Sequence, residues 1–156
     1  MKKMIWIVAI FLGFIISVKA IIIADNPKSK DVGNKILTLQ INNIKSDDGN
    51  IRIHIYNLAT REFFPKKTEN CFLLRVENLI DKSCIVKIPL PSDTYCLSVH
   101  HDENANISMD TNFFGLPTEG WGISNNVRLL MRLPKFDECS FQVTEKDTTI
   151  SVNMRY

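Results

Sequence analysis

Apolar and polar residues alternate with a period of two along most of the chain beyond residue 34, and no other feature constrains the fold as strongly. At positions 51, 53 and 55, for example, isoleucine is separated by polar residues. Because successive side chains of a β-strand point to opposite faces, each alternating segment predicts a strand with one buried face. The pattern occurs in seven segments, which span residues 37–42, 51–56, 72–77, 86–88, 95–100, 141–143 and 150–156.

Turn-forming residues separate these segments. Residues 47–50, Asp-Asp-Gly-Asn, are a strong hairpin signal between the first two strands, and Pro89 and Pro91 interrupt the chain before the fifth. No stretch of helical length shows an apolar stripe with a period of 3.6 residues. Seven strands without a long helix predict an all-β protein, folded over residues 34–156 as an antiparallel seven-stranded β-sandwich, with a closed barrel as the alternative.

One long segment, residues 101–138, interrupts this rhythm of strands. Loops of such length are uncommon inside a compact domain, and they usually serve a function or are held in place by something. The segment contains several aromatic residues, among them Phe113, Phe114 and Trp121. Aromatic side chains favour packing against the domain over free exposure to water. We therefore expect one long ordered loop.

The first twenty residues have the layout of a secretory signal peptide. Lys2 and Lys3 precede an apolar run over residues 4–18, and Ala20 offers a small residue at a cleavage position. The run is shorter than the roughly 20 residues that span a bilayer, and an uncleaved membrane anchor is the alternative. We expect a signal peptide at residues 1–20, a polar leader at residues 21–33, and an exported protein, periplasmic or extracellular, without a membrane span after cleavage.

The charge balance argues against nucleic acid as a partner. The whole chain carries 19 Lys and Arg against 17 Asp and Glu, and three of the basic residues lie in the predicted signal peptide. The remaining residues form a near-neutral domain without a cluster of Lys or Arg. Nucleic-acid binding relies on such a basic surface, so we expect no partner of this class.

All four cysteines lie in the part of the chain that is predicted to be exported. An even number of cysteines in an oxidising compartment predicts two disulfides. Separation along the chain favours Cys71 with Cys84, which leaves Cys96 with Cys139; four buried free thiols are the alternative. No Cys-x-x-Cys pair is present, so a thioredoxin-like redox site and a zinc knuckle find no support.

The start of the long segment carries oxygen-bearing side chains at regular spacing. They stand at the first, third, fifth and ninth positions of a loop that begins at Asp102, and a main-chain carbonyl falls at the seventh. With this spacing a tight loop surrounds a hard cation such as Ca²⁺. The predicted calcium ligands are Asp102, Asn104, Asn106, Ser108, Asp110 and Asn112, with Glu119 as a further candidate.

Two positions depart from the usual calcium loop. Ile107 stands at the sixth position, where a sharp turn normally requires glycine, and Phe113 stands at the twelfth, where a bidentate glutamate is usual. These departures exclude a helix–loop–helix hand, and a looser calcium loop extending from a strand is expected instead. The alternative is that the Asp and Asn side chains cap their own turns.

Enzyme signatures are weak in this chain. Ser124 lacks the glycine that follows the serine of a nucleophile elbow, and no glycine-rich phosphate loop occurs. The leading hypothesis is a non-catalytic module that binds an unknown protein or glycan partner, or a component of the cell envelope. The alternatives are a periplasmic hydrolase that uses His101 with Asp102 or Glu119, and a structural accessory domain without a ligand. The predicted binding surface consists of Phe113, Phe114, Glu119 and Trp121.

The central part of the chain resembles a known bacterial family. Residues 95–104, Tyr-Cys-Leu-Ser-Val-His-His-Asp-Glu-Asn, are followed by Asp-Thr-Asn at 110–112, Gly-Leu-Pro at 115–117 and Glu-Gly-Trp-Gly-Ile-Ser-Asn-Asn at 119–126. This pattern resembles the secreted family known as domain of unknown function 2141. The resemblance extends to the last strand and covers nearly all of the chain after the predicted signal peptide.

The resemblance implies an exported β-sandwich similar to transthyretin-like or carboxypeptidase-regulatory-like modules, an architecture that is also immunoglobulin-like, and it assigns no activity. Members of the family tend to have alanine at the positions of Cys96 and Cys139, so a disulfide between these two would be particular to this chain. They tend to have glycine at the position of Ile107, the sixth of the predicted calcium loop.

Overall fold

The computed structural model describes residues 34–128 and 132–156. The predicted signal peptide, residues 1–20, and the predicted polar leader, residues 21–33, lie outside the described residues. Among the described residues, no helix is long and apolar enough to cross a membrane.

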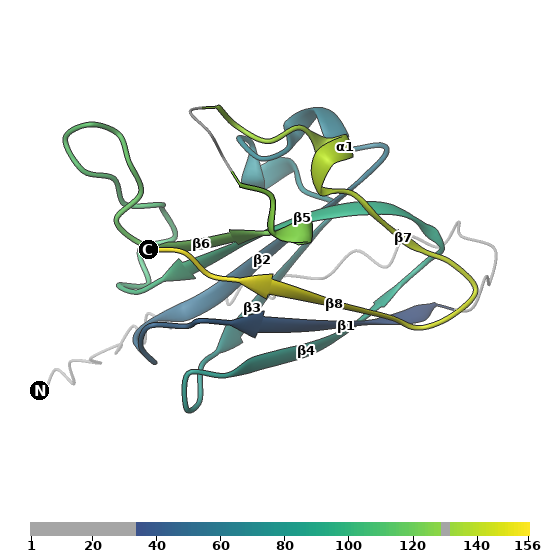
Figure 1. The fold of residues 1–156 in the computed structure, drawn as a ribbon, viewed down its shortest axis with the longest axis horizontal. Coiled ribbons are helices and arrows are strands. Elements are labelled where there is room, and N and C mark those ends of the chain that lie inside the picture. The colour runs from purple at the N-terminus through teal and green to yellow at the C-terminus, as the bar shows by residue number, and fades with distance from the viewer. Residues whose placement is uncertain (1–33, 129–131) are drawn as a thin grey trace, which may run out of the picture. The chain divides into compact units, whose positions relative to one another are not determined.

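Two β-sheets hold most of the regular structure (Figure 1). Their strands are β1 (Lys35–Asn42), β2 (Asn50–Asn57), β3 (Leu73–Asn78), β4 (Cys84–Leu90), β5 (Asp93–Asp102), β6 (Gly120–Ile123), β7 (Phe141–Val143) and β8 (Thr148–Asn153), and the helices are η1 (Arg61–Phe63), η2 (Thr68–Asn70), η3 (Ser124–Asn126) and α1 (Phe136–Cys139). The three-stranded sheet has the order β4–β1–β8, with β1 antiparallel to β4 and parallel to β8. The five-stranded sheet has the order β3–β2–β5–β6, and β7 pairs with the beginning of β5.

The predicted all-β fold is confirmed, but the hairpin expected between the first two strands is wrong. β1 and β2 belong to different sheets, and the turn at residues 47–50 connects the two sheets. Two further differences concern the strands. The described residues contain eight strands instead of seven, because β6 lies inside the segment that was expected to be one loop. Gly120 and Gly122 alternate with Trp121 in β6, so the alternating apolar pattern is missing there. An added Cβ at Gly122 would lie 2.5 Å from Cγ1 of Val152, so β6 and β8 approach too closely for a side chain. The second difference is the parallel pairing of β1 with β8, which alternation along one strand does not encode.

The main core lies between the two sheets and contains the apolar residues that alternation predicts to be buried. Leu37 and Leu39 of β1 belong to the same buried cluster as Ile53 of β2 and Leu97 and Val99 of β5. Full burial of such a side chain stabilises the fold by about 1.5–3 kcal/mol. These residues hold β2 and β5 rigidly in place, and the outer faces of the two strands carry the candidate site.

A second apolar cluster covers one end of the outer face of the five-stranded sheet. Tyr56, Phe64 and Phe136 pack there edge to face, with ring centroids 5.3 Å apart for the first pair and 6.5 Å for the second. Cys96 and Cys139 complete the cluster. Because α1 and the segment after η1 supply these side chains, this end of the outer face is closed.

The four cysteines are free thiols in the structure. Cys96 and Cys139 hydrogen-bond to each other within the second cluster, and burial raises the pKa of the Cys96 thiol. Cys71 packs against the same cluster, whereas Cys84 belongs to the main core. This placement gives no support to the pairing of Cys71 with Cys84. The sulfur atoms of Cys96 and Cys139 lie together, and a disulfide between them stays a prediction.

Candidate functional site

Asp102, the last residue of β5, anchors the beginning of the long loop. Its side chain is buried, and its two carboxylate oxygens accept hydrogen bonds from the backbone N–H groups of Asn106 and Ile107, each at 2.9 Å. Alternation along β5 places Asp102 on the outer face of the sheet, together with His100. Two backbone N–H groups held by one buried carboxylate fix the direction in which the loop leaves the sheet.

Glu119 anchors the end of the same loop, directly before β6. One carboxylate oxygen accepts the N–H of Glu103 at 3.0 Å, and the other accepts the N–H of Asp110 at 3.0 Å and the Nε2–H of His100 at 2.9 Å. Burial alone would raise the pKa of Glu119, but these donors outweigh it and lower the pKa below its usual value. Glu119 therefore stays ionised and ties both ends of the loop to β5.

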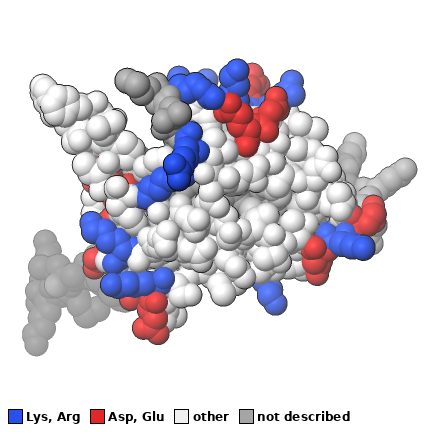
Figure 2. Space-filling view, viewed as in Figure 1, with Lys and Arg blue, Asp and Glu red and all other residues white. Residues whose placement is uncertain are grey.

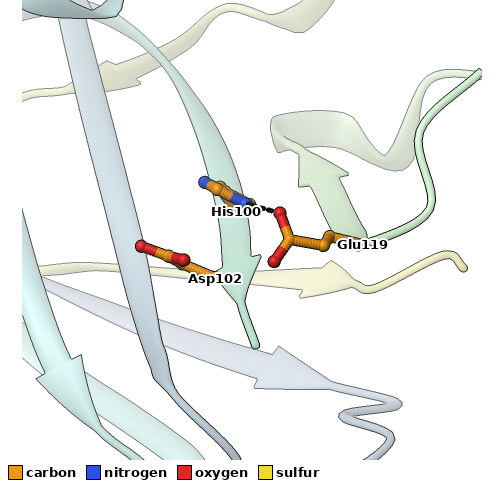
Figure 3. A group of neighbouring side chains, drawn as sticks. All are labelled: His100, Asp102 and Glu119. Carbon is orange, nitrogen blue, oxygen red and sulfur yellow. Dashed lines mark hydrogen bonds and ion pairs between the residues drawn. The ribbon is translucent and has the colours of Figure 1, made fainter. Parts of the chain in front are cut away.

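His100, Asp102 and Glu119 form a buried group whose ligand-type atoms all lie within 4.8 Å of one another. Figure 3 shows His100 and Asp102 on β5, with the Glu119 carboxylate directed at the imidazole. An imidazole and two carboxylates are ligands that a divalent metal accepts. All four carboxylate oxygens, however, already accept hydrogen bonds within the loop base. In this arrangement the three side chains hold the base of the loop in place.

The hydrolase alternative pairs His101 with Asp102 or Glu119, but His101 lies on the other face of β5 from both carboxylates. The side chain of His101 is fully buried on the opposite face of β5. Its Nε2 donates to the carbonyl of Asp48 at 2.8 Å, and its Nδ1 accepts from the hydroxyl of Tyr156 at 2.7 Å. Both ring nitrogens are thus engaged in structural bonds. The histidine beside Glu119 is His100, which could have been inferred only from the pairing of β5 with β6.

The predicted calcium ligands partly converge. Asn104 and Asn106 both donate from their side-chain amides to the Asp110 carboxylate, at 2.6 and 3.1 Å. Ile107 has φ +77°, the left-handed conformation that the sixth position of a calcium loop normally reserves for glycine. The side chain of Asn112, in contrast, accepts the N–H groups of Phe114 and Leu116 and caps its own turn.

This donor set fits a hard cation in its chemistry and in its backbone turn. Asp102, Asn104, Asn106 and Asp110 offer side-chain oxygens around one tight turn. The side-chain oxygens of Asn104 and Asn106 accept the backbone N–H groups of Asn106 and Ser108, so a cation held by Asp110 would have to compete with these bonds. Asp and Asn side chains that cap their own turns make the same hydrogen bonds, so the geometry agrees both with a calcium site and with turn caps.

The predicted binding residues divide into three places. Phe113 and Phe114 stand at the tip of the loop with 97% and 82% of their surface exposed, and their rings pack edge to face. Figure 2 shows the protruding tip free of charged side chains. Trp121 is half-buried on β6, where the Arg155 guanidinium stacks over its ring at 5.2 Å. Glu119 is buried in the loop base and offers no surface to a partner.

A groove of about 900 Å³ lies on the outer face of the five-stranded sheet, beside the loop. His54, Ser98 and Trp121 belong to its floor, and Ile107 and Leu116 of the loop line one wall. Among the described lining residues none is Asp or Glu, and most are apolar. The groove was not expected from the sequence, because its walls come from segments far apart in the chain.

The loop and its base lie inside a stretch that matches a family model. The family is described as an uncharacterized protein conserved in bacteria (DUF2141), and the match covers residues 39–151. The chain belongs to this family. The matched part of this DUF2141 protein includes β5, β6 and the loop between them, with both buried carboxylates. Neither the curated proteins nor the solved structures with which the chain was compared gave a match.

His54 of this DUF2141 protein lies at the floor of the groove and makes the domain sensitive to acid. Burial, together with the neighbouring Arg52 and His100, lowers the pKa of His54 from 6.5 to about 4. As the pH falls below 6.5, the unfolded chain therefore takes up a proton at this residue before the folded chain does. Stability that is fully present above pH 6.5 is lost as the pH falls through 4. Between pH 7 and pH 5, we expect His54 to lower the free energy of unfolding by about 2 kcal/mol.

Urea unfolding of the wild type and of His54→Gln at pH 7 and pH 5 measures this contribution. The wild type and the variant contain the same carboxylates, which also titrate in this range. The difference between the two proteins in the pH dependence of the free energy of unfolding therefore reports on His54. We expect a shallower fall in the variant. Parallel pH dependences would mean that His54 titrates normally in the folded state.

Proposed function

We propose that this protein is an exported, non-catalytic β-sandwich module that binds a protein partner, or a protein component of the cell envelope, through the long loop and the adjoining groove. One observation carries the proposal: two adjacent phenylalanines are almost fully exposed at the tip of a loop whose base is fixed by buried carboxylates. Exposed apolar patches on a soluble domain usually mark an interaction site.

The rigid base supports this interpretation. A mobile loop would lose conformational entropy on binding, and that loss weakens association. Here Asp102 and Glu119 already hold both ends of the loop through backbone hydrogen bonds. The aromatic tip is thereby preorganised for contact, which favours a role in recognition.

The chemistry of the groove supports a protein partner over a glycan. A sugar presents many hydroxyl groups, and a buried site for it needs polar side chains to pair with them. The wall of the groove next to the tip is formed mostly by apolar residues, among them Ile107, Met109 and Leu116, and Ser108 is its polar member. An apolar peptide segment fits this surface better. The layout of residues 1–20, as a signal peptide, supports export.

Photo-crosslinking in the producing bacterium tests the binding surface. A photoreactive phenylalanine analogue at position 113 or 114 is expected to give one defined crosslinked species, which mass spectrometry identifies. The matched control places the same analogue at Ile85, which is exposed on β4 in the other sheet. Equal crosslinking from all three positions, or none from the tip, would favour the alternative of a ligand-free accessory domain.

We further propose that Ca²⁺ binds at the turn formed by Asp102, Asn104, Asn106 and Asp110 and stabilises the loop. A ligand present at about 100 times its dissociation constant stabilises the folded state by about 2.7 kcal/mol. For a domain of this size we expect the melting temperature to be several degrees higher in millimolar Ca²⁺ than in EDTA. Mg²⁺ should not reproduce the shift, because it prefers a smaller octahedral shell.

The Asp110→Asn variant is the matched control for the calcium measurement. It removes one charge from the candidate site and leaves the Asp102 carboxylate in the loop base. The calcium-dependent shift should disappear in this variant. If the wild type shows no shift either, the Asp and Asn residues are turn caps, and the loop is held by hydrogen bonds alone.

A further inference from the structure

β3 is an edge strand with little protection against pairing. Among the described residues it pairs only with β2, so its other edge presents backbone N–H and C=O groups without a strand partner. Proteins commonly protect such edges with proline or lysine, and β4, an edge of the other sheet, carries Lys87 and Pro89. β3 contains neither residue type.

Apolar side chains are exposed along this edge strand. Leu74 and Val76 project on the outer face with 42% and 47% of their surface exposed. Phe72 and Ile80, at the two ends of the same segment, are also exposed. A strand added beside β3 would cover part of this apolar surface and satisfy the free backbone groups, as in β-augmentation.

The charges of β3 are arranged so that the strand complements itself. Arg75 and Glu77 flank Val76, and their side chains form an ion pair of 2.9 Å on one face of the strand. In an antiparallel pair of two β3 strands centred on Val76, Arg75 of each copy lies opposite Glu77 of the other. Opposite charges in such cross-strand positions stabilise the pair, and like charges destabilise it. If the charges of β3 protected this edge against self-pairing, each charged side chain would lie opposite a like charge of the second copy.

We propose that two copies of this chain associate through antiparallel pairing of their β3 strands about a two-fold axis at Val76. The two five-stranded sheets then continue into one another across the axis. Val76 faces Val76 of the second copy, and the exposed Phe72 and Ile80 come together at each end of the paired segment. The contact is isologous, as is usual for a symmetric dimer. None of residues 72–80 lines the groove or belongs to the long loop.

Charge reversal at the two positions tests the pairing. R75E places acidic residues at both positions 75 and 77, and E77R places basic residues at both. In either homodimer, two attractive cross-strand pairs become repulsive. We expect the wild type to dimerise reversibly with concentration in sedimentation equilibrium, and each single variant to dimerise at least about tenfold more weakly.

An equimolar mixture of R75E and E77R separates an intermolecular role from a structural one. Within each variant chain the Arg75–Glu77 ion pair stays broken, but across the axis acidic residues of one chain now face basic residues of the other. The mixture should therefore recover dimers, as should the double variant R75E/E77R. Circular dichroism of each variant checks that the exposed substitutions leave the fold intact.

Any one of three results would overturn the proposal. One is a wild type that remains monomeric up to millimolar concentration. Another is a mixture of R75E and E77R that associates no better than either variant alone. If single variants dimerise as well as the wild type, another surface holds the dimer, and pairing through β3 is likewise refuted.

Discussion

Replacing Glu119 with alanine should destabilise the domain by about 3 kcal/mol, because it removes a buried carboxylate that accepts three hydrogen bonds. The substitution removes the acceptor for the N–H groups of Glu103 and Asp110 and leaves the buried His100 ring without its partner. All three donors then stay desolvated without compensation, which costs more than the average hydrogen bond. Urea unfolding measures the change in free energy.

The same variant should release the loop before it unfolds the domain. Limited proteolysis is expected to cut within residues 103–118 of Glu119→Ala under conditions in which the wild type resists. The matched control is Glu145→Ala, which removes an exposed carboxylate from the segment between β7 and β8. Equal stability and equal protease resistance of the two variants would show that the loop does not depend on its buried carboxylate.

Replacing Gly49 with alanine should destabilise the domain by about 3 kcal/mol or more. Gly49 lies in the turn before β2 with φ +65°, a conformation that an L side chain adopts only at a cost. In addition, an alanine Cβ would overlap the backbone oxygen of Asp102, and backbone cannot move aside as a flexible side chain can. The turn and the end of β5 must therefore separate, which also disturbs the loop base.

Gly115→Ala separates these two costs. Gly115 has φ +76°, but nothing lies within 4 Å of the position that a Cβ would occupy. This variant should be destabilised only by the unfavourable backbone conformation of its alanine, by about 1 kcal/mol. Thermal or urea unfolding of both variants gives the comparison. A Gly49→Ala variant as stable as Gly115→Ala would mean that the turn tolerates displacement from β5.

The sequence predicted the parts of this fold that depend on local pattern. Alternation placed Ile53 and Val99 in the core correctly, because a strand with one buried face has a period of two regardless of its partners. It missed β6, where Gly120 and Gly122 carry no side chain to mark the buried face. The parallel pairing of β1 with β8 joins distant parts of the chain, and no local pattern records it.

In the candidate site, too, the sequence predicted the features that depend on local pattern and missed those that depend on tertiary packing. The spacing that begins at Asp102 predicted a calcium loop, with turn caps as the alternative. Asp102 holds the turn through two backbone N–H groups, and calcium binding stays a prediction. The choice between His100 and His101 depended on which face of β5 meets Glu119, and that follows from the register in which His100 lies opposite Trp121. The burial of Glu119 and the groove likewise arise from tertiary packing, so residue types alone assigned Glu119 to an exposed surface.

The hydrogen bonds of the loop divide it into two parts with different tolerance to change. Residues 111–118 bond almost entirely among themselves: Asn112 N–H donates to the Leu116 carbonyl, and Gly115 N–H donates to the Asn112 carbonyl. The anchoring bonds join His100 and residues 102–110 to one another and to Glu119. Doubling the length of a loop costs only about 0.6 kcal/mol. The tip can therefore be exchanged or lengthened while the sandwich stays intact, so evolution, or a protein engineer, can treat the sandwich as a display scaffold.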